Sequence, residues 1–387
     1  MNNKTRKQQK QKKQKQKKQK QIAGKFIKEG SYGCVFRPAI HCDTNSNITP
    51  DSISKVMDKV EAQIEYDIGQ NVAKIDADQQ YTLYPKRLCN LKKPWSIRNN
   101  TYKCKAIQTK DVAQLIYTDG GYDLTSVIER IKSMNFSIHI KFFNAFQNVL
   151  EGIKKLHTHN FVHMDLKSDN IICSLTGSEN SWFRRGKPTY NMRLIDFGLS
   201  DYISNIISED NNNFLRTYYI WPYELRLIHS QYRHKQPKFS DFEDYKIYIR
   251  SVVIRGEKIK CHPYWIMDEH SRDTPAIDLY IDINNSINTG KDKEIIPEIL
   301  KKTDIYSLGI TLSYIYSYLT NHYLLENNKI TFNKKTQPLH DTLSVPIYEL
   351  IKKMVHPDYR KRSTIDDVIA EYKQIFSIFF SKLDYSI

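Results

Sequence analysis

The chain has 387 residues, of which 40% are hydrophobic and 26% charged, with 13 glycines and 13 prolines. This composition is typical of a folded globular protein and excludes fibrous proteins and chains that are disordered throughout. The formal net charge is +16, but the first 21 residues hold ten basic residues and no acidic one, so most of the excess belongs to this tail.

Two further features bear on the compartment in which the protein works. No apolar run approaches the roughly 18 residues that a membrane span needs, and the N-terminus lacks the apolar stretch of a secretory signal. We therefore expect an intracellular protein. The six cysteines lack the paired spacing of zinc sites, and this predicts reduced thiols. They are Cys34, Cys42, Cys89, Cys104, Cys173 and Cys261.

Residues 1–21 are predicted to be a disordered basic tail. Positions 4–21 carry no aliphatic or aromatic side chain, so nothing there offsets the roughly 1–2 kcal/mol per residue that ordering a backbone costs. One interpretation is contact with a polyanion, such as nucleic acid or an acidic membrane or protein surface. The other is a solvated extension without a partner.

From residue 22 onward the segments alternate between apolar and polar patterns. Strands are predicted over 25–36, 53–57 and 112–117, and helices over 60–75, 137–157, 304–320, 344–355 and 364–383. A strand-rich first third followed by a helical remainder indicates an α+β fold with two lobes. Three stretches interrupt the pattern and predict insertions in surface loops, near 86–105, 174–192 and 225–303. The last of these is interpreted either as a docking surface or as a tolerated loop.

The first run with chemical meaning is EGSYGCV, residues 29–35, between two strand-like segments. Glycines at 30 and 33 allow a backbone to approach a phosphate closely and present N–H groups to it, while Val35 could cover an apolar base. An ordinary hairpin turn explains the same run equally simply, because two glycines three residues apart carry little information.

A lysine then occurs in the middle of an apolar strand, in ISKVM at residues 53–57. If Lys55 points inward it needs an anionic partner, because an unpaired buried cation is costly. The next predicted helix offers Glu61 and Glu65 one turn apart on one face. An exposed lysine on an edge strand is the alternative.

The most informative run is FVHMDLKSDNII, residues 161–172, directly after a long helix. Asp165 and Asn170 lie five residues apart, and they provide a carboxylate that can orient a hydroxyl and take its proton, and an amide oxygen that can coordinate a metal. Lys167 can place positive charge beside a phosphoryl group. The run LIDFG at 194–198 ends an apolar strand with Asp196, a natural Mg²⁺ ligand.

Taken in order, these runs resemble the signature motifs of the eukaryotic-type protein kinase family. Later segments are similar to the family as well: PYE at 222–224, DIYSLG at 304–309 and residues 357–364. The resemblance implies a two-lobed protein-kinase-like fold within residues 22–380. A small β-rich N-lobe would span 22–117, and a larger α-helical C-lobe would span 122–380.

The resemblance also implies a nucleotide site for ATP. The turn would cover ATP, and Lys55 would contact its α and β phosphates while paired with an acid of the next helix, for which Glu65 is preferred over Glu61. Leu115 or Ile116 would lie behind the adenine, and residues 116–118 would offer backbone bonds to it. The implied nucleotide-binding residues are Lys28, Gly30, Gly33, Val35, Lys55, Glu65, Leu115, Ile116 and Thr118.

For catalysis, the resemblance implies that Asp165 is the base and that Lys167 steadies the γ-phosphate, while Asn170 and Asp196 hold Mg²⁺. A lysine two residues after the catalytic aspartate, as at Lys167, resembles the serine/threonine type of kinase. The implied function is an ATP- and Mg²⁺-dependent kinase of protein serine and threonine hydroxyls. A pseudokinase that acts as a scaffold is the alternative.

Several neighbouring residues are predicted to be structural. His163 and Phe197 look like core residues, and Glu224 is expected to pair with Arg362 or Arg360. Residues 163–170, which carry Asp165 and Asn170, are called the catalytic loop. By resemblance, Thr217 would contact this loop, while Tyr218 and Tyr219 would line the site for the substrate residue that follows the acceptor.

Two departures from the family pattern affect regulation and source. Lys28 stands where a glycine is usual, and Met164 replaces the usual arginine beside the catalytic aspartate, so a phosphate in the activation segment would lack its guanidinium partner. We therefore expect little dependence on activation-segment phosphorylation.

The richness in Lys, Asn, Ile and Tyr and the loose motifs resemble those of kinases of large DNA viruses. This resemblance implies host cytoplasm or virion as the location.

Overall fold

The computed structural model describes residues 24–30, 33–44, 49–91, 111–132, 134, 136–176, 189–208, 218, 220–222, 224–228, 279, 282–283, 285–286, 289–320, 325–326, 329–330 and 337–383. The predicted basic tail lies outside these residues. The chain divides into two compact units, here called the N-terminal unit (Met1–Gln79 and Leu83–Gly120) and the C-terminal unit (Gln80–Thr82 and Gly121–Ile387).

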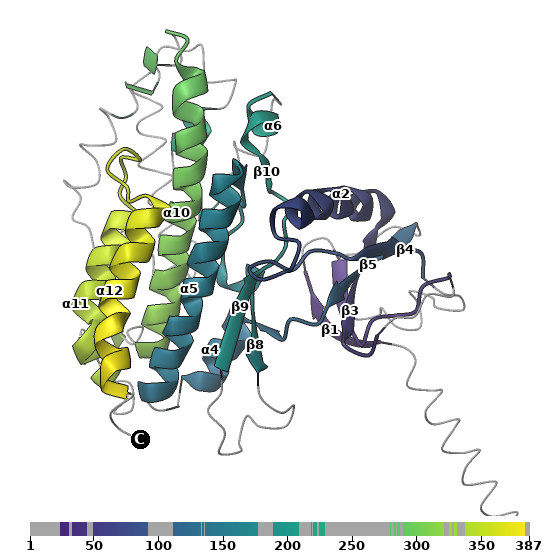
Figure 1. The fold of residues 1–387 in the computed structure, drawn as a ribbon, viewed down its shortest axis with the longest axis horizontal. Coiled ribbons are helices and arrows are strands. Elements are labelled where there is room, and N and C mark those ends of the chain that lie inside the picture. Colours follow the sequence, from purple (N-terminus) through teal and green to yellow (C-terminus); the bar gives the residue numbers. More distant parts are fainter. Residues whose placement is uncertain are drawn as a thin grey trace, which may run out of the picture. The chain divides into compact units, whose positions relative to one another are not determined.

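The N-terminal unit contains β1 (Lys25–Glu29), β2 (Gly33–Arg37), β3 (Ser52–Asp58), α2 (Lys59–Ile75), β4 (Arg87–Cys89) and β5 (Val112–Thr118). The strands form an antiparallel sheet in the order β1-β2-β3-β5-β4, and α2 packs on β3 and β5 (Figure 1). Asp58 caps α2 by accepting the Val60 N–H at 2.9 Å. The strands and the helix predicted for this region are therefore present.

The register of this sheet decides which side chains share a face. Val35, Lys55 and Leu115 lie directly opposite one another on β2, β3 and β5. Because strand side chains alternate, Ile116 lies on the other face from Leu115. Leu115 packs with Met57 and the helix side, whereas Ile116 packs with a cluster that includes Cys42 and Cys89.

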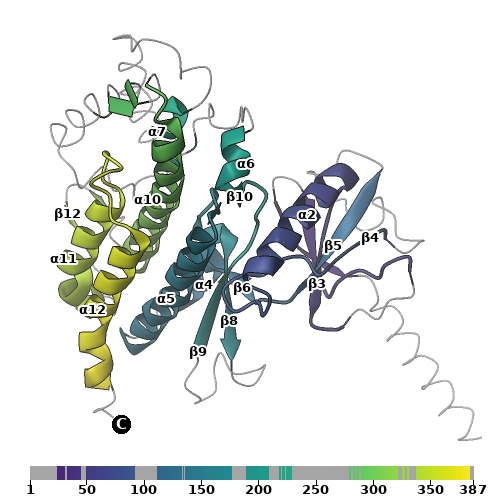
Figure 2. The same cartoon turned by 45° about the horizontal axis from the view of Figure 1, so that its top comes forward.

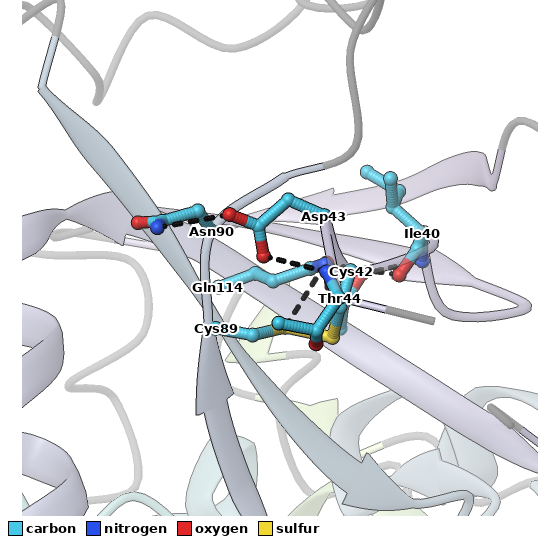
Figure 3. The surroundings of a disulfide bond; sticks show 8 residues. Ile40, Cys42, Asp43, Thr44, Cys89, Asn90 and Gln114 are labelled. Carbon is cyan, nitrogen blue, oxygen red and sulfur yellow. Dashed lines mark hydrogen bonds between the residues drawn. A yellow bond between two sulfur atoms is a disulfide. The ribbon is translucent and has the colours of Figure 1, made fainter. Parts of the chain in front are cut away.

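Cys42 and Cys89 form a disulfide in this second cluster, so the prediction of reduced thiols is wrong for both (Figure 3). Cys34 is disulfide-bonded as well. The prediction rested on sequence spacing, whereas a disulfide requires spatial proximity, and the fold brings the two Cα atoms to 5.8 Å across a separation of 47 residues, beside an isolated bridge between Cys42 and Leu91. Buried Cys173 is a free thiol, and burial raises its pKa to about 12.

Polar contacts surround this disulfide and hold the two chain segments together. Buried Gln114 donates its amide to the Ile40 carbonyl at 3.0 Å and lies 3.5 Å from the Cys89 Sγ atom. Asn90 donates to the Asp43 carboxylate at 3.1 Å, as Figure 3 shows. The disulfide therefore ties the segment after β2 to β4, which is the strand at the sheet edge beside β5.

Replacing Cys42 by serine is expected to lower the free energy of unfolding by about 2–4 kcal/mol, because the disulfide restricts the unfolded chain over a long loop. Thermal unfolding without reductant measures the loss, with Cys173→Ser as the control that removes a thiol but no cross-link. In a non-reducing digest the Cys42 and Cys89 peptides should be linked. Recovery of both cysteines as free, alkylated thiols would contradict the pairing.

The C-terminal unit contains most of the helices. Its elements are β6 (Tyr122–Asp123), α4 (Leu124–Ile131), α5 (Phe136–Thr158), β7 (Phe161–Val162), η1 (Ser168–Asn170), β8 (Ile171–Thr176), β9 (Thr189–Leu194), β10 (Asp201–Tyr202), α6 (Ile203–Ser208), α7 (Glu224–Leu227), α10 (Asp292–Thr320), β11 (Leu325–Glu326), β12 (Lys329–Ile330), α11 (Gln337–Met354) and α12 (Ile365–Leu383). In Figures 1 and 2, α5, α10, α11 and α12 lie side by side.

Aromatic contacts between α5 and α12 form a large part of this unit's core. The rings of Phe143 and Phe376 stack with centroids 5.6 Å apart, and the Tyr372 hydroxyl donates to the Phe143 carbonyl at 2.6 Å. The apolar stripe predicted for 137–157 is buried, as expected for α5. None of the helices among the described residues is long and apolar enough to cross a membrane.

The predicted insertions extend too far at their ends. Residues 174–176 and 189–192 belong to the paired strands β8 and β9, and residues 87–89 form β4. Helix α10 begins at Asp292 rather than 304, and α11 begins at Gln337 rather than 344. Both helices contain a proline, Pro297 in α10 and Pro346 in α11.

Candidate active site

In the N-terminal unit, the lysine in the apolar strand has the acidic partner that it requires. Lys55 Nζ lies 2.9 and 2.7 Å from the two carboxylate oxygens of Glu65, and both side chains are largely buried. The Tyr117 hydroxyl also donates to Glu65, at 2.5 Å. Glu61 is exposed, so of the two acids considered, Glu65 is the one that pairs. This pair fixes the direction of the Lys55 ammonium group.

The two glycines of the turn differ in what surrounds them. A Cβ atom on Gly33 would lie 2.4 Å from the Val56 carbonyl oxygen, so β2 and β3 can approach this closely only without a side chain. Among the described residues, the nearest atom to a Cβ on Gly30 would be the Gly33 carbonyl oxygen, at 3.7 Å. Gly33 therefore has a packing role, whereas the Gly30 N–H donates to the Gly33 carbonyl at 2.8 Å. Lys28 is exposed on β1 and lies opposite Val35.

The three nucleotide candidates of β5 have different surroundings. Leu115 shares the face of Lys55 and Val35 and is fully buried. Ile116 points to the opposite face, and its carbonyl accepts the Lys86 N–H at 2.8 Å. Thr118 ends the strand, with its hydroxyl 3.4 Å from Gln79. The geometry favours Leu115 over Ile116 as the side chain near a nucleotide, and these binding roles stay predictions.

In the C-terminal unit, the structure brings Asp165, Lys167 and Asn170 together. Lys167 Nζ lies 3.0 and 2.9 Å from the two carboxylate oxygens of Asp165. The Asn170 amide donates to Asp165 Oδ2 at 2.7 Å and to the Asp165 carbonyl at 2.9 Å. Asp165 and Asn170 are buried, whereas Lys167 is half-exposed. A carboxylate held in this way has a fixed orientation, which a general base requires.

Buried polar groups hold the backbone of this loop from both sides. The Asp304 carboxylate accepts the backbone N–H groups of His163 and Met164 at 2.9 and 2.8 Å. Three carbonyls of the loop are bonded by side chains elsewhere in the unit. Ser200 donates to the His163 carbonyl at 2.8 Å, Trp221 to that of Met164 at 2.7 Å, and Thr311 to that of Leu166 at 3.1 Å.

Sequence reasoning singled out residues 304–309 but did not predict these contacts to the loop. The signal was present in α10, where Asp304, Ser307 and Thr311 recur at helical spacing within an otherwise apolar segment. Such a buried polar stripe needs partners. Ser307 donates to the Ile220 carbonyl at 2.7 Å, so the stripe contacts the segment before α7 as well as the catalytic loop.

Asn170 and Asp196 lie at the same end of the β8–β9 strand pair. Ile171 pairs with Leu194, and the Ile195 N–H donates to the Asn170 carbonyl at 3.0 Å. Because the Asn170 nitrogen donates to Asp165, the amide oxygen is the atom left for a metal. Asp196 has a φ of 61°, in the left-handed region where non-glycine residues are strained.

These two oxygen ligands fit Mg²⁺, which is held by one or two protein ligands plus phosphate oxygens and water. Across the described residues, no group of three or more His, Cys, Asp or Glu side chains could hold a metal ion.

His163, Phe197 and Met164 are buried, in keeping with structural roles. The rings of His163 and Phe197 are 4.9 Å apart, and His163 Nε2 lies 3.1 Å from the Ile195 carbonyl. Burial lowers the pKa of the His163 ring, which therefore stays neutral near pH 7. Met164 is 1% exposed and has a φ of 63°.

Tyr218 contacts the catalytic loop, whereas it was predicted only to line the site beyond the acceptor. Its hydroxyl donates to Asp165 Oδ1 and accepts from Lys167 Nζ at 2.9 Å. Thr217, expected to make the contact to the loop, lies outside the described residues, as does Tyr219.

Comparison with known proteins identifies a family for part of the chain. Residues 99–239 match the family model of the protein kinase domain, a range that includes Asp165, Asn170 and Asp196 but not Lys55. Together with a strand-rich N-terminal unit and a helical C-terminal unit, this match shows that the chain has a two-lobed protein-kinase-like fold.

Three curated relatives are protein kinases by name. The chain is 39% identical over 59 residues to serine/threonine-protein kinase 17A of Oryctolagus cuniculus, covering 15% of this chain and 12% of that protein. It is 33% identical over 79 residues to the sporulation-specific mitogen-activated protein kinase SMK1 of Saccharomyces cerevisiae (20% and 16%). It is 28% identical over 115 residues to serine/threonine-protein kinase PTK2 of Candida glabrata (27% and 13%).

The chain thus spans less than a fifth of the length of each of these relatives. The matched segments are similar to parts of protein kinases. The substrates and partners of the relatives are not carried over by matches of this length.

Proposed function

We propose that the protein is an ATP- and Mg²⁺-dependent kinase that transfers the γ-phosphate of ATP to serine and threonine hydroxyls of protein substrates. The observation that carries the proposal is the arrangement of Asp165, Lys167 and Asn170 on a loop whose backbone is bonded by buried groups. The serine/threonine class is supported by Lys167 and by the names of two relatives.

In the proposed mechanism, Asp165 accepts a hydrogen bond from the acceptor hydroxyl and takes its proton as the oxygen attacks the γ-phosphorus. Lys167, next to Asp165, offsets negative charge on the transferred group. Lys55, oriented by Glu65, binds phosphate oxygens of ATP. Asn170 and Asp196 would hold Mg²⁺, which supplies positive charge to the phosphates when it is bound.

The proposal extends to partners and location. The basic tail of residues 1–21 is proposed to contact a polyanion, and its charge supports this. The loose motifs and the composition support a source among large DNA viruses and a location inside the host cell or in the virion. Disulfides are more frequent in oxidising compartments, so the Cys42–Cys89 disulfide does not support a location inside the host cell.

Replacing Lys55 by methionine tests the nucleotide part of the proposal. We expect transfer of labelled phosphate from ATP to casein to fall by about 10²-fold, because one positioned charge on the phosphates is lost. Lys59→Met is the matched control, since Lys59 is more than half exposed at the start of the next helix. It should transfer phosphate like the wild type.

Two outcomes would speak against the proposal. Equal transfer by Lys55→Met and by Lys59→Met would remove Lys55 from the reaction. Binding of ATP without any transfer by the wild type, under conditions in which a control kinase works, would favour the pseudokinase.

A further inference from the structure

The Asp165 carboxylate has no hydrogen-bonding capacity left for a substrate in this structure. Oδ1 accepts from Tyr218 and from Lys167, and Oδ2 accepts from Lys167 and from Asn170. A carboxylate has about four lone-pair positions, so these four contacts fill it. An acceptor hydroxyl can bind Asp165 only if one of the four donors leaves.

Tyr218 is the donor whose chemistry matches an acceptor. Lys167 and Asn170 are nitrogen donors on the same loop as Asp165, whereas Tyr218 offers a hydroxyl from a segment more than 50 residues away in sequence. Its oxygen also accepts from Lys167 Nζ at 2.9 Å. The phenol oxygen therefore lies between the proposed base and the proposed charge-neutralising lysine, where the attacking oxygen of a substrate is required.

Contacts around the tyrosine hold its ring in this position. The rings of Tyr218 and Trp221 meet edge to face with centroids 5.2 Å apart, and the backbone N–H of Trp221 donates to the Tyr218 carbonyl at 2.9 Å. Trp221 is itself anchored on the catalytic loop through the Met164 carbonyl. The hydroxyl is thus presented to Asp165 by a turn that the loop itself supports.

We infer that Tyr218 occupies the acceptor-hydroxyl position and inhibits the enzyme until a substrate displaces it. This inference rests on the proposed kinase function. With Tyr218 withdrawn, Asp165 can take a proton from another hydroxyl. The oxygen of that hydroxyl bonds to the γ-phosphorus, the bond from phosphorus to the bridging oxygen breaks, and ADP leaves. When the hydroxyl belongs to water, the products are ADP and inorganic phosphate.

Replacing Tyr218 by phenylalanine in the full chain tests the inference, because it removes the hydroxyl and keeps the ring against Trp221. We expect kcat/KM for casein, and the rate of ATP hydrolysis with water as the acceptor, to rise about threefold or more as the competing hydrogen bonds disappear. The KM for ATP should not change. Tyr218→Ala, which also removes the ring, should raise both rates at least as much.

Tyr202→Phe is the matched control. The Tyr202 ring packs edge to face on Phe161 with centroids 5.2 Å apart, and its hydroxyl has no assigned part in the reaction, so loss of this hydroxyl should leave both rates unchanged. Unchanged or lower rates in Tyr218→Phe, while the wild type transfers phosphate to casein, would overturn the inference and leave the kinase function standing. Lower rates would indicate that Tyr218 positions Asp165. Absence of transfer by the wild type and by all variants would reject the kinase function and this inference with it.

Discussion

Asp165→Asn is expected to lower phosphate transfer to casein by about 10²–10⁴-fold, the range typical for loss of a general base. Asparagine keeps the size of the side chain but cannot accept the proton of an acceptor hydroxyl. The contacts of Asp165 are local to its loop and to Tyr218, so the midpoint of thermal unfolding should change by only a few degrees. Binding of ATP should persist, because the proposed nucleotide contacts lie elsewhere in the sequence.

Asp169→Asn is the matched control for this measurement. Asp169 lies in the same loop, on η1, and has no assigned part in the reaction. The Asp169→Asn substitution removes the same charge four residues after Asp165, so this variant should retain most of the phosphate transfer. Equal transfer by wild type and Asp165→Asn would remove Asp165 as the base, and an equal loss in Asp169→Asn would indicate a general charge effect.

Arg362→Met is expected to lower the free energy of unfolding by about 3–5 kcal/mol, since it leaves a buried charge without its partner. Arg362 Nη2 lies 2.7 Å from Glu224 Oε1, and both side chains are almost completely buried. The same guanidinium donates to the carbonyls of His356 and Lys302, at 2.8–3.0 Å. Of the two arginines considered from the sequence, Arg362 is the partner of Glu224.

Arg360→Met provides the comparison, because Arg360 is also in ion pairs but is 43% exposed. Its partner Asp282 is exposed but its partner Asp358 is 3% exposed, so this variant should lose some stability, yet less than Arg362→Met, whose guanidinium is itself completely buried. The midpoint for Arg362→Met should fall by about 3–6 °C. In the double variant Arg362→Met/Glu224→Leu, part of the loss should be recovered, because no buried charge remains. Equal loss in Arg360→Met and Arg362→Met would contradict this view of the pair.

The effect of Arg362→Met should also depend on pH. Burial raises the pKa of the Glu224 carboxyl, although Arg362 opposes the shift. A carboxyl with a raised pKa in the folded state binds its proton more tightly there than in the unfolded state. The free energy of unfolding therefore falls as the pH rises from the unfolded-state pKa through the folded-state pKa. Without the guanidinium the shift grows, and the loss of stability should be larger at pH 7 than at pH 5.

The sequence predicted the catalytic elements well because their information is local. Periodicity predicts the strand with Lys55 and the acidic helix after it, and the resemblance to protein kinases favoured Glu65, which is the acid that pairs with Lys55. The catalytic loop places Asp165 and Asn170 five residues apart, so chain geometry alone keeps them close. Strand and helix patterns likewise predicted α2, β5 and α5 within a few residues.

The features that sequence reasoning missed depend on contacts between distant segments. The Cys42–Cys89 disulfide joins two segments that are 47 residues apart in the sequence. The bond from Asp304 to the loop spans more than 140 residues, and that from Tyr218 to Asp165 spans 53. A single sequence contains the residue types for these contacts but not their pairing, which only the folded chain determines.

The most direct test of the central claim is transfer of label from γ-³²P-ATP to casein by the full chain, with Mg²⁺ or with EDTA, and with α-³²P-ATP as the control for bound nucleotide. Two oxygen ligands and a positioned aspartate predict transfer from the γ-labelled nucleotide only, present with Mg²⁺ and lost in EDTA. Label should appear on serine or threonine. Absence of transfer with Mg²⁺, or transfer that EDTA leaves undiminished, would contradict the account.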